Sequence, residues 1–326
     1  MITKEIIYKR AFDEQKSLLK ERQLEHNILL SSVYASEPRL KDIENRLSFV
    51  GAQLAITALS GDKKKLTALK SEATALGKDK KAILKKAGVK DFKYNCSLCN
   101  DTGYVSGKIC ECIKKSAGNI MISEFSKQMP INTCRFDNFD LKYYPSKGSN
   151  ANENPKRRMT AIFKACKEYA LNFNPLTSKN LIFYGNAGLG KTHLTMAIVS
   201  SVIEKGFLPV YGSAENLFSI IEGEKFSGEN KGSYDMMLGC DLLVIDDLGA
   251  EMATAFTKSV LYNLINTRIM SGKPTIINTN LSIKAINEKY DARIASRIIG
   301  SYNSHVFLGI DIRQQKAMEK QSQEEF

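Results

Sequence analysis

Apolar residues in the first third of the chain recur at alternating spacings of three and four positions, which is the seam of helices that pack side by side. The first seam consists of Leu40, Ile43, Leu47, Val50 and Leu54. A second seam runs over residues 66–87, and Gly61 and Asp62 interrupt the pattern between the two. Two such helices with a short break predict an antiparallel hairpin. An earlier helical pattern over residues 2–33 could complete a small bundle, so we expect a helical N-terminal domain over residues 1–90.

The second half of the chain shows a different pattern, in which short apolar runs alternate with helical segments. We expect strands at residues 180–185, 207–211, 241–246, 274–279 and 304–309, with helices between them. This alternation is typical of the α/β class, with a parallel sheet flanked by helices. The predicted α/β domain comprises residues 156–315 and is followed by a C-terminal tail at residues 316–326.

A cysteine-rich segment at residues 91–118 and a connector at residues 119–155 lie between these two regions. The segment contains a C-x-x-C pair and a C-x-C pair, formed by Cys96, Cys99, Cys110 and Cys112. Four thiolates at these spacings can close tetrahedrally around Zn²⁺, and a site with no spare ligand position is structural and not catalytic. Free thiols or redox chemistry are the alternatives. We expect the remaining cysteines, Cys134, Cys166 and Cys240, to be ordinary buried thiols.

Composition and charge narrow the class of protein. The 326 residues are 43% hydrophobic and 25% charged, which is ordinary for a globular protein. No apolar run approaches the ~18 residues of a membrane helix, and the N-terminus lacks the apolar core of a signal peptide. We therefore expect a cytoplasmic protein with no membrane partner. The formal net charge is +12, and residues 1–115 carry 23 Lys and Arg against 14 Asp and Glu.

This basic N-terminal third indicates an acidic partner, either nucleic acid or the acidic face of a protein. Many of its lysines decorate the helix expected at residues 66–87 and the turn before it: Lys63, Lys64, Lys65, Lys78, Lys80, Lys81, Lys85 and Lys86. They form either an ordinary solvated face or a surface for a partner or DNA, and charge alone does not choose between the two.

A glycine-rich turn follows the first strand of the α/β domain and opens directly into a helix. It reads G-x-x-x-x-G-K-T from Gly185 to Thr192, and its glycines let successive backbone N–H groups point at an anion. Lys191 can reach the outer phosphates of a nucleotide, and the Thr192 hydroxyl can ligate Mg²⁺. We therefore predict that the chain binds a nucleoside triphosphate through Gly185, Asn186, Ala187, Gly188, Leu189, Gly190, Lys191, Thr192 and His193.

Polar residues also end two later strands. Asp246 and Asp247 close the strand expected at residues 241–246, at the sheet edge where α/β proteins bind ligands. We expect Asp246 to hold Mg²⁺ through water, and Asp247 to orient or deprotonate the attacking water. Asn280, or alternatively Asn278, could hydrogen-bond this water or the γ-phosphate.

Two arginines lie far from the glycine-rich turn, one helical turn apart at Arg293 and Arg297. An arginine in this position is useful for catalysis if it reaches into the site of a neighbouring subunit as an arginine finger. Ordinary arginines on a surface helix are the alternative.

The ordered set of motifs GNAGLGKTH, LLVIDDLGAE, NTNL, RIASRI and GIDIR resembles the AAA+ helicase loaders of the DnaC/DnaI group, and it is similar to the transposition ATPase IstB. The resemblance covers about residues 131–315, beginning with RFDNFDL. The C-x-x-C-x-D-T-G segment and the helical N-terminus resemble the loaders of the Gram-positive type. The resemblance implies an AAA+ domain that binds ATP and single-stranded DNA, and an N-terminal domain that binds the DnaB-type replicative helicase.

The resemblance also implies roles for single residues. Lys191 and Thr192 would bind phosphate and Mg²⁺, and Asp246 with Asp247 would form the Walker B pair. Asn280 would be sensor 1. Arg297 would be the arginine finger in preference to Arg293. ATP would be hydrolysed at the interfaces of a homo-oligomer. Arg313 in GIDIR would be sensor 2. The usual Walker B pair is Asp-Glu, so the shorter Asp247 predicts slow hydrolysis. The chain also leaves no room for the helical lid of a typical AAA+ protein.

Three functions compete at this stage. The first is an ATP-dependent DNA replication protein that loads the replicative helicase onto single-stranded DNA. The second is an IstB-like transposition ATPase, and the third is an ATP-gated assembly switch in which hydrolysis is incidental. All three require ATP and Mg²⁺, and the cysteine segment adds Zn²⁺.

Overall fold

The chain folds into two compact units in this computed structural model. Residues Asp13–Gly103 form one unit, and Met1–Phe12 together with Tyr104–Phe326 form the other. The structure describes residues 3–126, 133–147, 154–228 and 232–324. None of the helices within these ranges is long and apolar enough to span a membrane.

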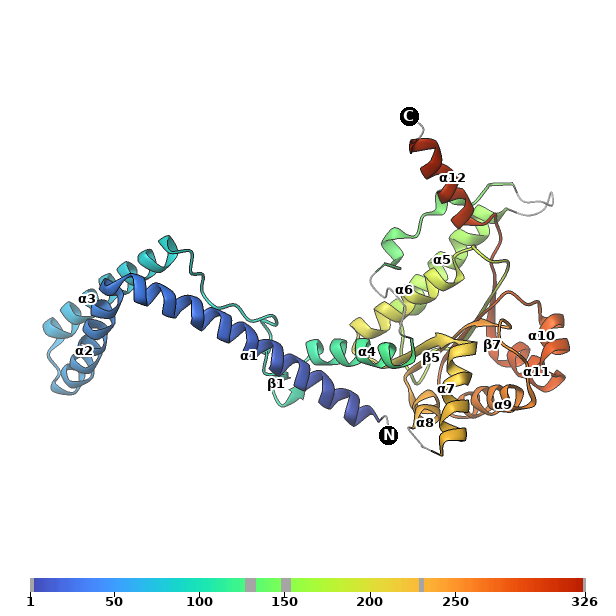
Figure 1. Ribbon diagram of the computed structural model, residues 1–326, viewed down its shortest axis with the longest axis horizontal. Coiled ribbons are helices and arrows are strands. Elements are labelled where there is room, and N and C mark those ends of the chain that lie inside the picture. Colours follow the sequence, from blue (N-terminus) through green and yellow to red (C-terminus); the bar gives the residue numbers. More distant parts are fainter. Residues whose placement is uncertain (1–2, 127–132, 148–153, 229–231, 325–326) are drawn as a thin grey trace. The chain divides into compact units, whose positions relative to one another are not determined.

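The helical unit contains most of helix α1 (Lys4–Ser36) and the pair α2 (Pro38–Ser60) and α3 (Lys63–Lys86) (Figure 1). Helices α2 and α3 form the hairpin that their two seams predict. Gly61 ends α2 in the left-handed conformation, with φ of 77°, and the Asp62 carboxylate accepts a hydrogen bond from the Lys65 N–H to begin α3. The end of α1 joins this hairpin through a small core of Val33, Leu40 and Val89.

The compact units do not follow the expected domain bounds. Ile7 and Ala11 at the start of α1 belong to the core of the larger unit, which also contains Ile113 and Ala117 of helix α4 (Glu111–Phe125). Ile120 and Met121, near the start of the segment expected as a connector, belong to the same core. A small hairpin of β1 (Tyr104–Val105) and β2 (Lys108–Ile109) precedes α4.

The larger unit contains the predicted parallel sheet, and the α/β fold class is confirmed. Its strands are β3 (Asn180–Tyr184), β4 (Pro209–Ser213), β5 (Leu242–Leu248), β6 (Thr275–Thr279) and β7 (Tyr302–Val306). They pair in the order β4-β5-β6-β3-β7, with every pairing parallel. Because β5, β6 and β3 are parallel neighbours, their carboxyl ends lie side by side along one edge of the sheet.

Side chains alternate between the two faces of this sheet, as buried strands require. Along β5, Leu242 and Val244 pack in the core of one face, whereas Leu243 and Ile245 pack in the core of the other. The first core is covered by α5 (Pro155–Leu171) and α6 (Lys191–Glu204). The second core is covered by α7 (Ala214–Ser227), α8 (Ser233–Gly239), α9 (Ala255–Met270), α10 (Ile283–Lys289) and α11 (Ala292–Ser301) (Figure 1).

Two further segments lie next to the glycine-rich turn. Two short 3₁₀ helices, η1 (Phe136–Asn138) and η2 (Leu141–Tyr143), occupy the part of the chain expected as a connector. Helix α12 (Ile312–Glu324) follows β7, where the sequence suggested only a tail. Gln315 of α12 donates a side-chain hydrogen bond to the Tyr143 carbonyl at 3.3 Å, so α12 is connected to η2.

Candidate functional site

The glycine-rich turn between β3 and α6 requires glycine at its main positions. Gly185, Gly188 and Gly190 have φ values of 147°, 75° and 87°, which L-residues rarely adopt. A Cβ atom at Gly188 would lie 2.1 Å from the Asp311 carboxylate. A Cβ atom at Gly190 would lie 2.9 Å from the Phe139 ring. Asp311 and Phe139 thus pack closely against the turn. The turn continues directly into the N-terminus of α6, where free backbone N–H groups stabilise anions.

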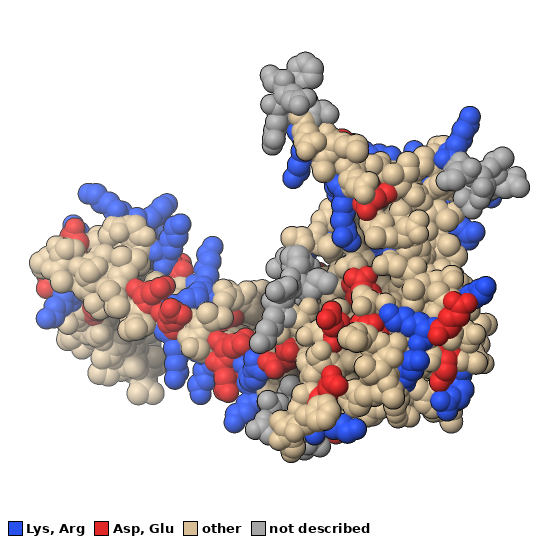
Figure 2. Space-filling model, turned by 45° about the vertical axis from the view of Figure 1, so that its right-hand side comes forward, with Lys and Arg blue, Asp and Glu red and all other residues tan. Residues whose placement is uncertain are grey.

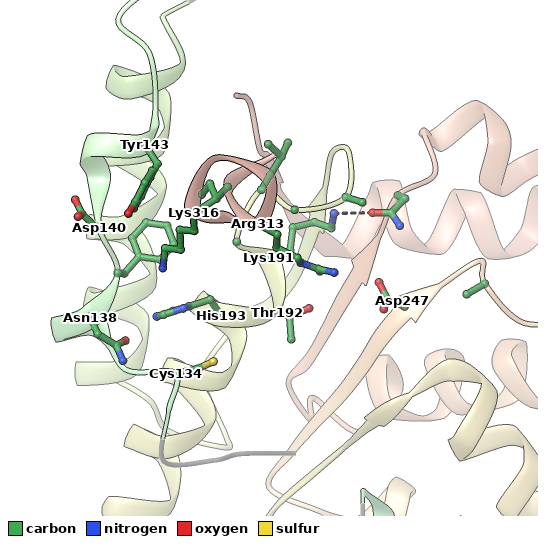
Figure 3. A pocket seen from close by; sticks show the side chains of 18 residues that line it. Cys134, Asn138, Asp140, Tyr143, Lys191, Thr192, His193, Asp247, Arg313 and Lys316 are labelled. Atoms are coloured by element: carbon green, nitrogen blue, oxygen red, sulfur yellow. Dashed lines mark hydrogen bonds between the residues drawn. The ribbon is translucent and has the colours of Figure 1, made fainter. Parts of the chain in front are cut away.

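Lys191 connects this turn to the end of β6. Its ammonium donates hydrogen bonds to the Gly185 carbonyl at 2.7 Å, to the Asn186 carbonyl at 2.8 Å and to Asn280 Oδ1 at 2.6 Å. The bond to Asn280 is visible in Figure 3. Burial lowers the pKa of Lys191, although the charges of Asp247 and Asp246 oppose this shift. A partly desolvated ammonium in this position is suited to bind an anion of several charges.

Asp246 is buried at the end of β5 and accepts hydrogen bonds from neighbouring elements. The Thr192 hydroxyl donates at 3.0 Å and the Asn278 amide at 2.7 Å. The Tyr211 hydroxyl of β4 also donates to this carboxylate, and the backbone N–H of Asp247 does so at 3.0 Å. Thr192 and Asp246 thus bring oxygen ligands of the kind that Mg²⁺ prefers to one point.

Asp247 leaves the regular strand and faces the pocket. The pairing of β5 with β6 shifts register between Ile245 and Leu248, and Asp247 has a φ of 50°. In Figure 3 its carboxylate lies opposite Lys191 and Thr192. Surrounding protein atoms displace part of the water around this exposed carboxyl and raise its pKa, and the charge of Asp246 raises it further. The bulge therefore places an aspartate of raised pKa in the lining of the pocket.

These groups border a pocket of about 460 Å³, which is the size of a site for a small ligand. The glycine-rich turn lines it through Ala187, Gly188, Leu189, Gly190, Lys191, Thr192 and His193. Asp247, Asn280 and Arg313, which the sequence also indicated, lie in the lining. Gly185 and Asn186 do not line the pocket, and they take part through their carbonyls, which bind Lys191.

Sequence reasoning missed the opposite wall of this pocket. Its further lining residues are Cys134, Asn138, Phe139, Asp140, Tyr143, Ala250, Ile312 and Lys316 (Figure 3). The Phe139 ring stacks on Phe163 at 5.5 Å, and the Tyr144 hydroxyl donates to the Leu189 carbonyl at 2.9 Å. These contacts hold the 3₁₀ segment against the turn. The aromatic spacing in RFDNFDL was the available signal.

One expectation about a cysteine needs correction, and the two candidate asparagines differ in position. Cys134 is not a fully buried thiol, because it is half-buried and lines the pocket, whereas Cys166 and Cys240 are buried. Burial raises the pKa of Cys166 to about 12. Asn278, the alternative to Asn280, is fully buried and binds Asp246, and its amide oxygen accepts from Thr195 at 3.0 Å.

Arg293 and Arg297 lie on α11 and do not line this pocket. Arg297 donates to Asn266 Oδ1 at 2.8 Å and to the Tyr262 hydroxyl at 2.7 Å, and its guanidinium stacks over the Tyr262 ring. Arg293 pairs with Asp291 at 3.0 Å. A catalytic role for either arginine would therefore require the site of another subunit.

The four cysteines of the segment at residues 96–112 converge locally. Their sulfur atoms all lie within 4.8 Å of one another. The turn after Cys99 has positive φ at Asn100 and Asp101, and the Asp101 carboxylate accepts the N–H groups of Asn95 and Cys96 at 2.9 and 2.8 Å. Four sulfur ligands and a braced turn fit a tetrahedral Zn²⁺ ion.

Comparisons with known proteins agree with the resemblance seen in the motifs. Residues 167–315 match the model of the family of IstB-like ATP binding proteins. The replicative helicase loader DnaC of Buchnera aphidicola subsp. Baizongia pistaciae is 27% identical over 169 residues, which are 51% of this chain and 63% of that protein. The replicative helicase loader DnaC of Escherichia coli strain K12 is 26% identical over 146 residues, 43% of this chain and 58% of that protein. The chain thus spans less than two thirds of these relatives.

Two solved structures are also similar to part of this chain. A crystal structure of the DnaC helicase loader has 23% identity and a TM-score of 0.47, and the match covers 55% of this chain and 99% of that one. A crystal structure of DnaI has 21% identity and a TM-score of 0.45, with 56% and 93% covered.

Proposed function

We propose that this chain is an ATP-dependent DNA replication protein that loads a DnaB-type replicative helicase onto single-stranded DNA. ATP dependence is supported above all by one observation: Lys191, Thr192, Asp247 and Asn280 line one pocket, and Asp246 binds Thr192 behind it. The names of the relatives support the loading part, since the curated relatives matched first are replicative helicase loaders.

Each residue of the pocket has a task in hydrolysis. The N–H groups of the glycine-rich turn and the Lys191 ammonium would hold the outer phosphates of ATP. Thr192, and Asp246 through water, would hold Mg²⁺, which supplies positive charge to the phosphates when bound. Asp247 would accept a hydrogen bond from the attacking water and orient it toward the γ-phosphate. Asn280 would bind this water or the γ-phosphate once Lys191 has turned to the nucleotide.

Hydrolysis would be completed between subunits. Arg313 of α12 lies in the pocket lining and would bind the phosphates in its own chain. Arg297, which lies outside that lining, would act as a finger in a neighbouring subunit and neutralise transition-state charge there. We therefore propose that the ATP-bound protein is a homo-oligomer. The helical unit and the cysteine segment lie outside the matched residues 167–315, and we propose that the unit binds the helicase and that Zn²⁺ holds the segment.

A transposition ATPase is the second candidate, because the matched family is named IstB-like. That function requires neither the helical unit nor the cysteine segment. An ATP-gated switch with incidental hydrolysis is the third, and the short Asp247 side chain favours it.

Copurification with a DnaB-type helicase tests the proposal. The full chain, with ATP and Mg²⁺, is expected to retain the helicase and to increase its displacement of an oligonucleotide annealed to a single-stranded circle. Lys191→Ala is the matched variant and should fail to increase unwinding. Absence of both helicase binding and stimulation would contradict the loader function. ATP-dependent retention of duplex DNA without helicase would favour the transposition ATPase.

A further inference from the structure

A second cavity lies wholly within the helical unit. It has a volume of about 860 Å³, against about 460 Å³ for the nucleotide pocket. It is a groove lined by residues of α1, by Glu44 of α2, by the end of α3 and by the segment after α3. The lining residues that matter here are Lys81, Lys85, Lys90, Lys93, Tyr34 and Phe92.

One lysine of this groove is already neutralised. Lys80 donates a hydrogen bond to the Glu44 carboxylate at 2.6 Å, and the Tyr34 hydroxyl donates to the same carboxylate at 2.6 Å. The hydrogen bond from Lys80, followed by that from Tyr34, lowers the pKa of Glu44, so this carboxylate stays ionised. The negative charge of Glu44 is therefore already paired with Lys80, and its carboxylate also accepts the Tyr34 hydroxyl.

The other lysines leave the groove positively charged. Lys81, Lys85, Lys90 and Lys93 are exposed, and no ion pair to them occurs in the part of the chain that the structure describes. Asp91 is the one further acidic residue in the lining. Figure 2 shows the blue side chains of Lys and Arg projecting from the helical unit at the left of the view.

Favourable interaction with the dipole of α3 accounts for only some of these lysines. Lys85 and Lys86 lie in the last turn of α3, where cations interact favourably with the helix dipole. Lys81 lies one turn earlier, and Lys90 and Lys93 lie beyond the helix, so the dipole does not account for them. Residues 63–86 contain nine lysines against Glu72 and Asp79, an excess that disfavours the folded helix by repulsion. A bound polyanion would relieve this repulsion.

Aromatic rings lie beside the lysines. Phe92 contacts the His26 ring edge-on at 5.5 Å and the Tyr94 ring at 5.3 Å, while the Arg22 guanidinium lies 5.5 Å from its centroid. Tyr94 is exposed, with 44% of its surface accessible. A groove that binds single-stranded nucleic acid combines lysines, which contact the phosphates, with aromatic rings, on which unpaired bases stack. An acidic peptide would use the lysines but has no bases to stack on the rings.

We propose that this groove binds the phosphate backbone of single-stranded nucleic acid, with bases stacked on the Phe92–Tyr94 ring pair. The site belongs to the helical unit and uses none of the residues of the proposed ATPase, so it stands or falls independently of that function. The groove exceeds the nucleotide pocket in volume, which fits a ligand longer than one nucleotide.

The test uses the full chain without ATP and a fluorescent oligothymidylate that contains 4-thiothymidine. Binding is measured by anisotropy over a salt series, and photocrosslinks are mapped by mass spectrometry. The variant is Lys81→Ala with Lys85→Ala, and the matched control is Lys64→Ala with Lys65→Ala, which removes the same charge from the first turn of the same helix. Phe92→Leu removes one ring and keeps an apolar side chain.

The groove variant is expected to lower the slope of log Kd against log salt by about 1.4, because each phosphate that a lysine neutralises on a single strand adds about 0.7 to this slope. The control should lower it much less. Crosslinks should map to residues 80–94 and disappear in Phe92→Leu. Equal slopes for the groove variant and wild type, or equal reductions in variant and control, would overturn the proposal. Polyglutamate that binds as tightly as the oligonucleotide, with the same lysine dependence, would also overturn it and identify an acidic protein segment as the occupant.

Discussion

The hydroxyl of Tyr211 donates a hydrogen bond to the carboxylate of Asp246, joining two adjacent parallel strands beside the glycine-rich turn. Both side chains are buried, and burial with the neighbouring Asp246 charge raises the pKa of Tyr211, so the phenol remains protonated and can only donate here. The bond fixes the carboxylate beside Thr192, whose hydroxyl lies 3.0 Å from it. Tyr211 therefore acts as a positioning residue for the proposed Mg²⁺ site.

Tyr211→Phe removes this donor without changing the shape of the core. Loss of a hydrogen bond to a buried charged group should cost roughly 1–3 kcal/mol of unfolding free energy. Affinity for Mg²⁺-ATP should also fall. Urea unfolding and titration with Mg²⁺ check the two effects. Tyr169→Phe is the control, because its hydroxyl donates to a neutral carbonyl, that of Lys179, at 3.0 Å. An equal or smaller loss for Tyr211→Phe than for this control would contradict the assigned role.

Asp247→Asn should bind Mg²⁺-ATP and hydrolyse it slowly. Asp246 still holds the ion, whereas the charge that orients the water is lost, a change that typically costs ~10²–10⁴ in rate. In wild type the rate should fall as the pH falls through the pKa of Asp247, and this acid limb should lie above the range of an ordinary aspartate because that pKa is raised. A pH–rate profile of both proteins checks this. Failure of the variant to bind nucleotide would show that the roles of the two aspartates are reversed.

The same substitution has a consequence for stability. A carboxyl whose pKa is higher in the folded chain than in the unfolded chain favours folding when protonated, and this contribution is lost as the pH rises through the folded pKa. Asp247→Asn should therefore stabilise the nucleotide-free chain at neutral pH, and the gain should shrink as the pH falls through that raised pKa. Urea unfolding at neutral and acidic pH measures it. A gain that grows toward acid would contradict the direction of the shift.

One Zn²⁺ per chain is expected, bound by Cys96, Cys99, Cys110 and Cys112, because their sulfur atoms lie within 4.8 Å of one another. Elemental analysis of wild type and Cys99→Ser checks this, with Cys134→Ser as the control outside the cluster. Cys99→Ser should lose the metal and Cys134→Ser should keep it. A metal-free, stably folded wild type with four titratable thiols in this segment would rule the site out.

Arg297→Ala tests catalysis between subunits. ATP affinity of the isolated subunit should change little, whereas hydrolysis by the assembled protein should fall, since an arginine finger is worth ~10³–10⁵ in rate. Arg293→Ala, one turn away, is the control and should retain more activity. Mixing Arg297→Ala with Asp247→Asn should restore some turnover, because some interfaces then join an intact finger to an intact Asp247. Activity of Arg297→Ala equal to wild type, under conditions where subunits associate, would exclude the finger role.

The sequence predicts those features of the fold that depend on short stretches of neighbouring residues. The G-x-x-x-x-G-K-T turn and the apolar strands are local, because glycine spacing and buried apolar runs determine them, and the observed sheet follows them closely. The opposite wall of the pocket depends on distant packing, since Phe139 rests on Phe163 and Gly190. The sequence predicts only a tail at residues 316–326, whereas the structure has helix α12 there, which contacts Tyr143 through Gln315. Spacing alone does not choose between Asn278 and Asn280, because residues two positions apart point to the same face of a strand. Strand β6 ends at Thr279, so Asn280 lies beyond the strand and reaches Lys191, whereas Asn278 lies inside it and binds Asp246.

Titration of Mg²⁺-ATP into Lys191→Ala tests the central claim most directly. The Lys191 ammonium lies between the glycine-rich turn and Asn280, and its loss removes a full positive charge that would otherwise contact the outer phosphates. Lys205→Ala, at the end of the same helix, is the control. We predict that Lys191→Ala binds ATP far more weakly than wild type or fails to turn it over, while its unfolding transition remains cooperative and the control behaves as wild type. Wild-type ATP affinity together with wild-type turnover in Lys191→Ala would contradict the account.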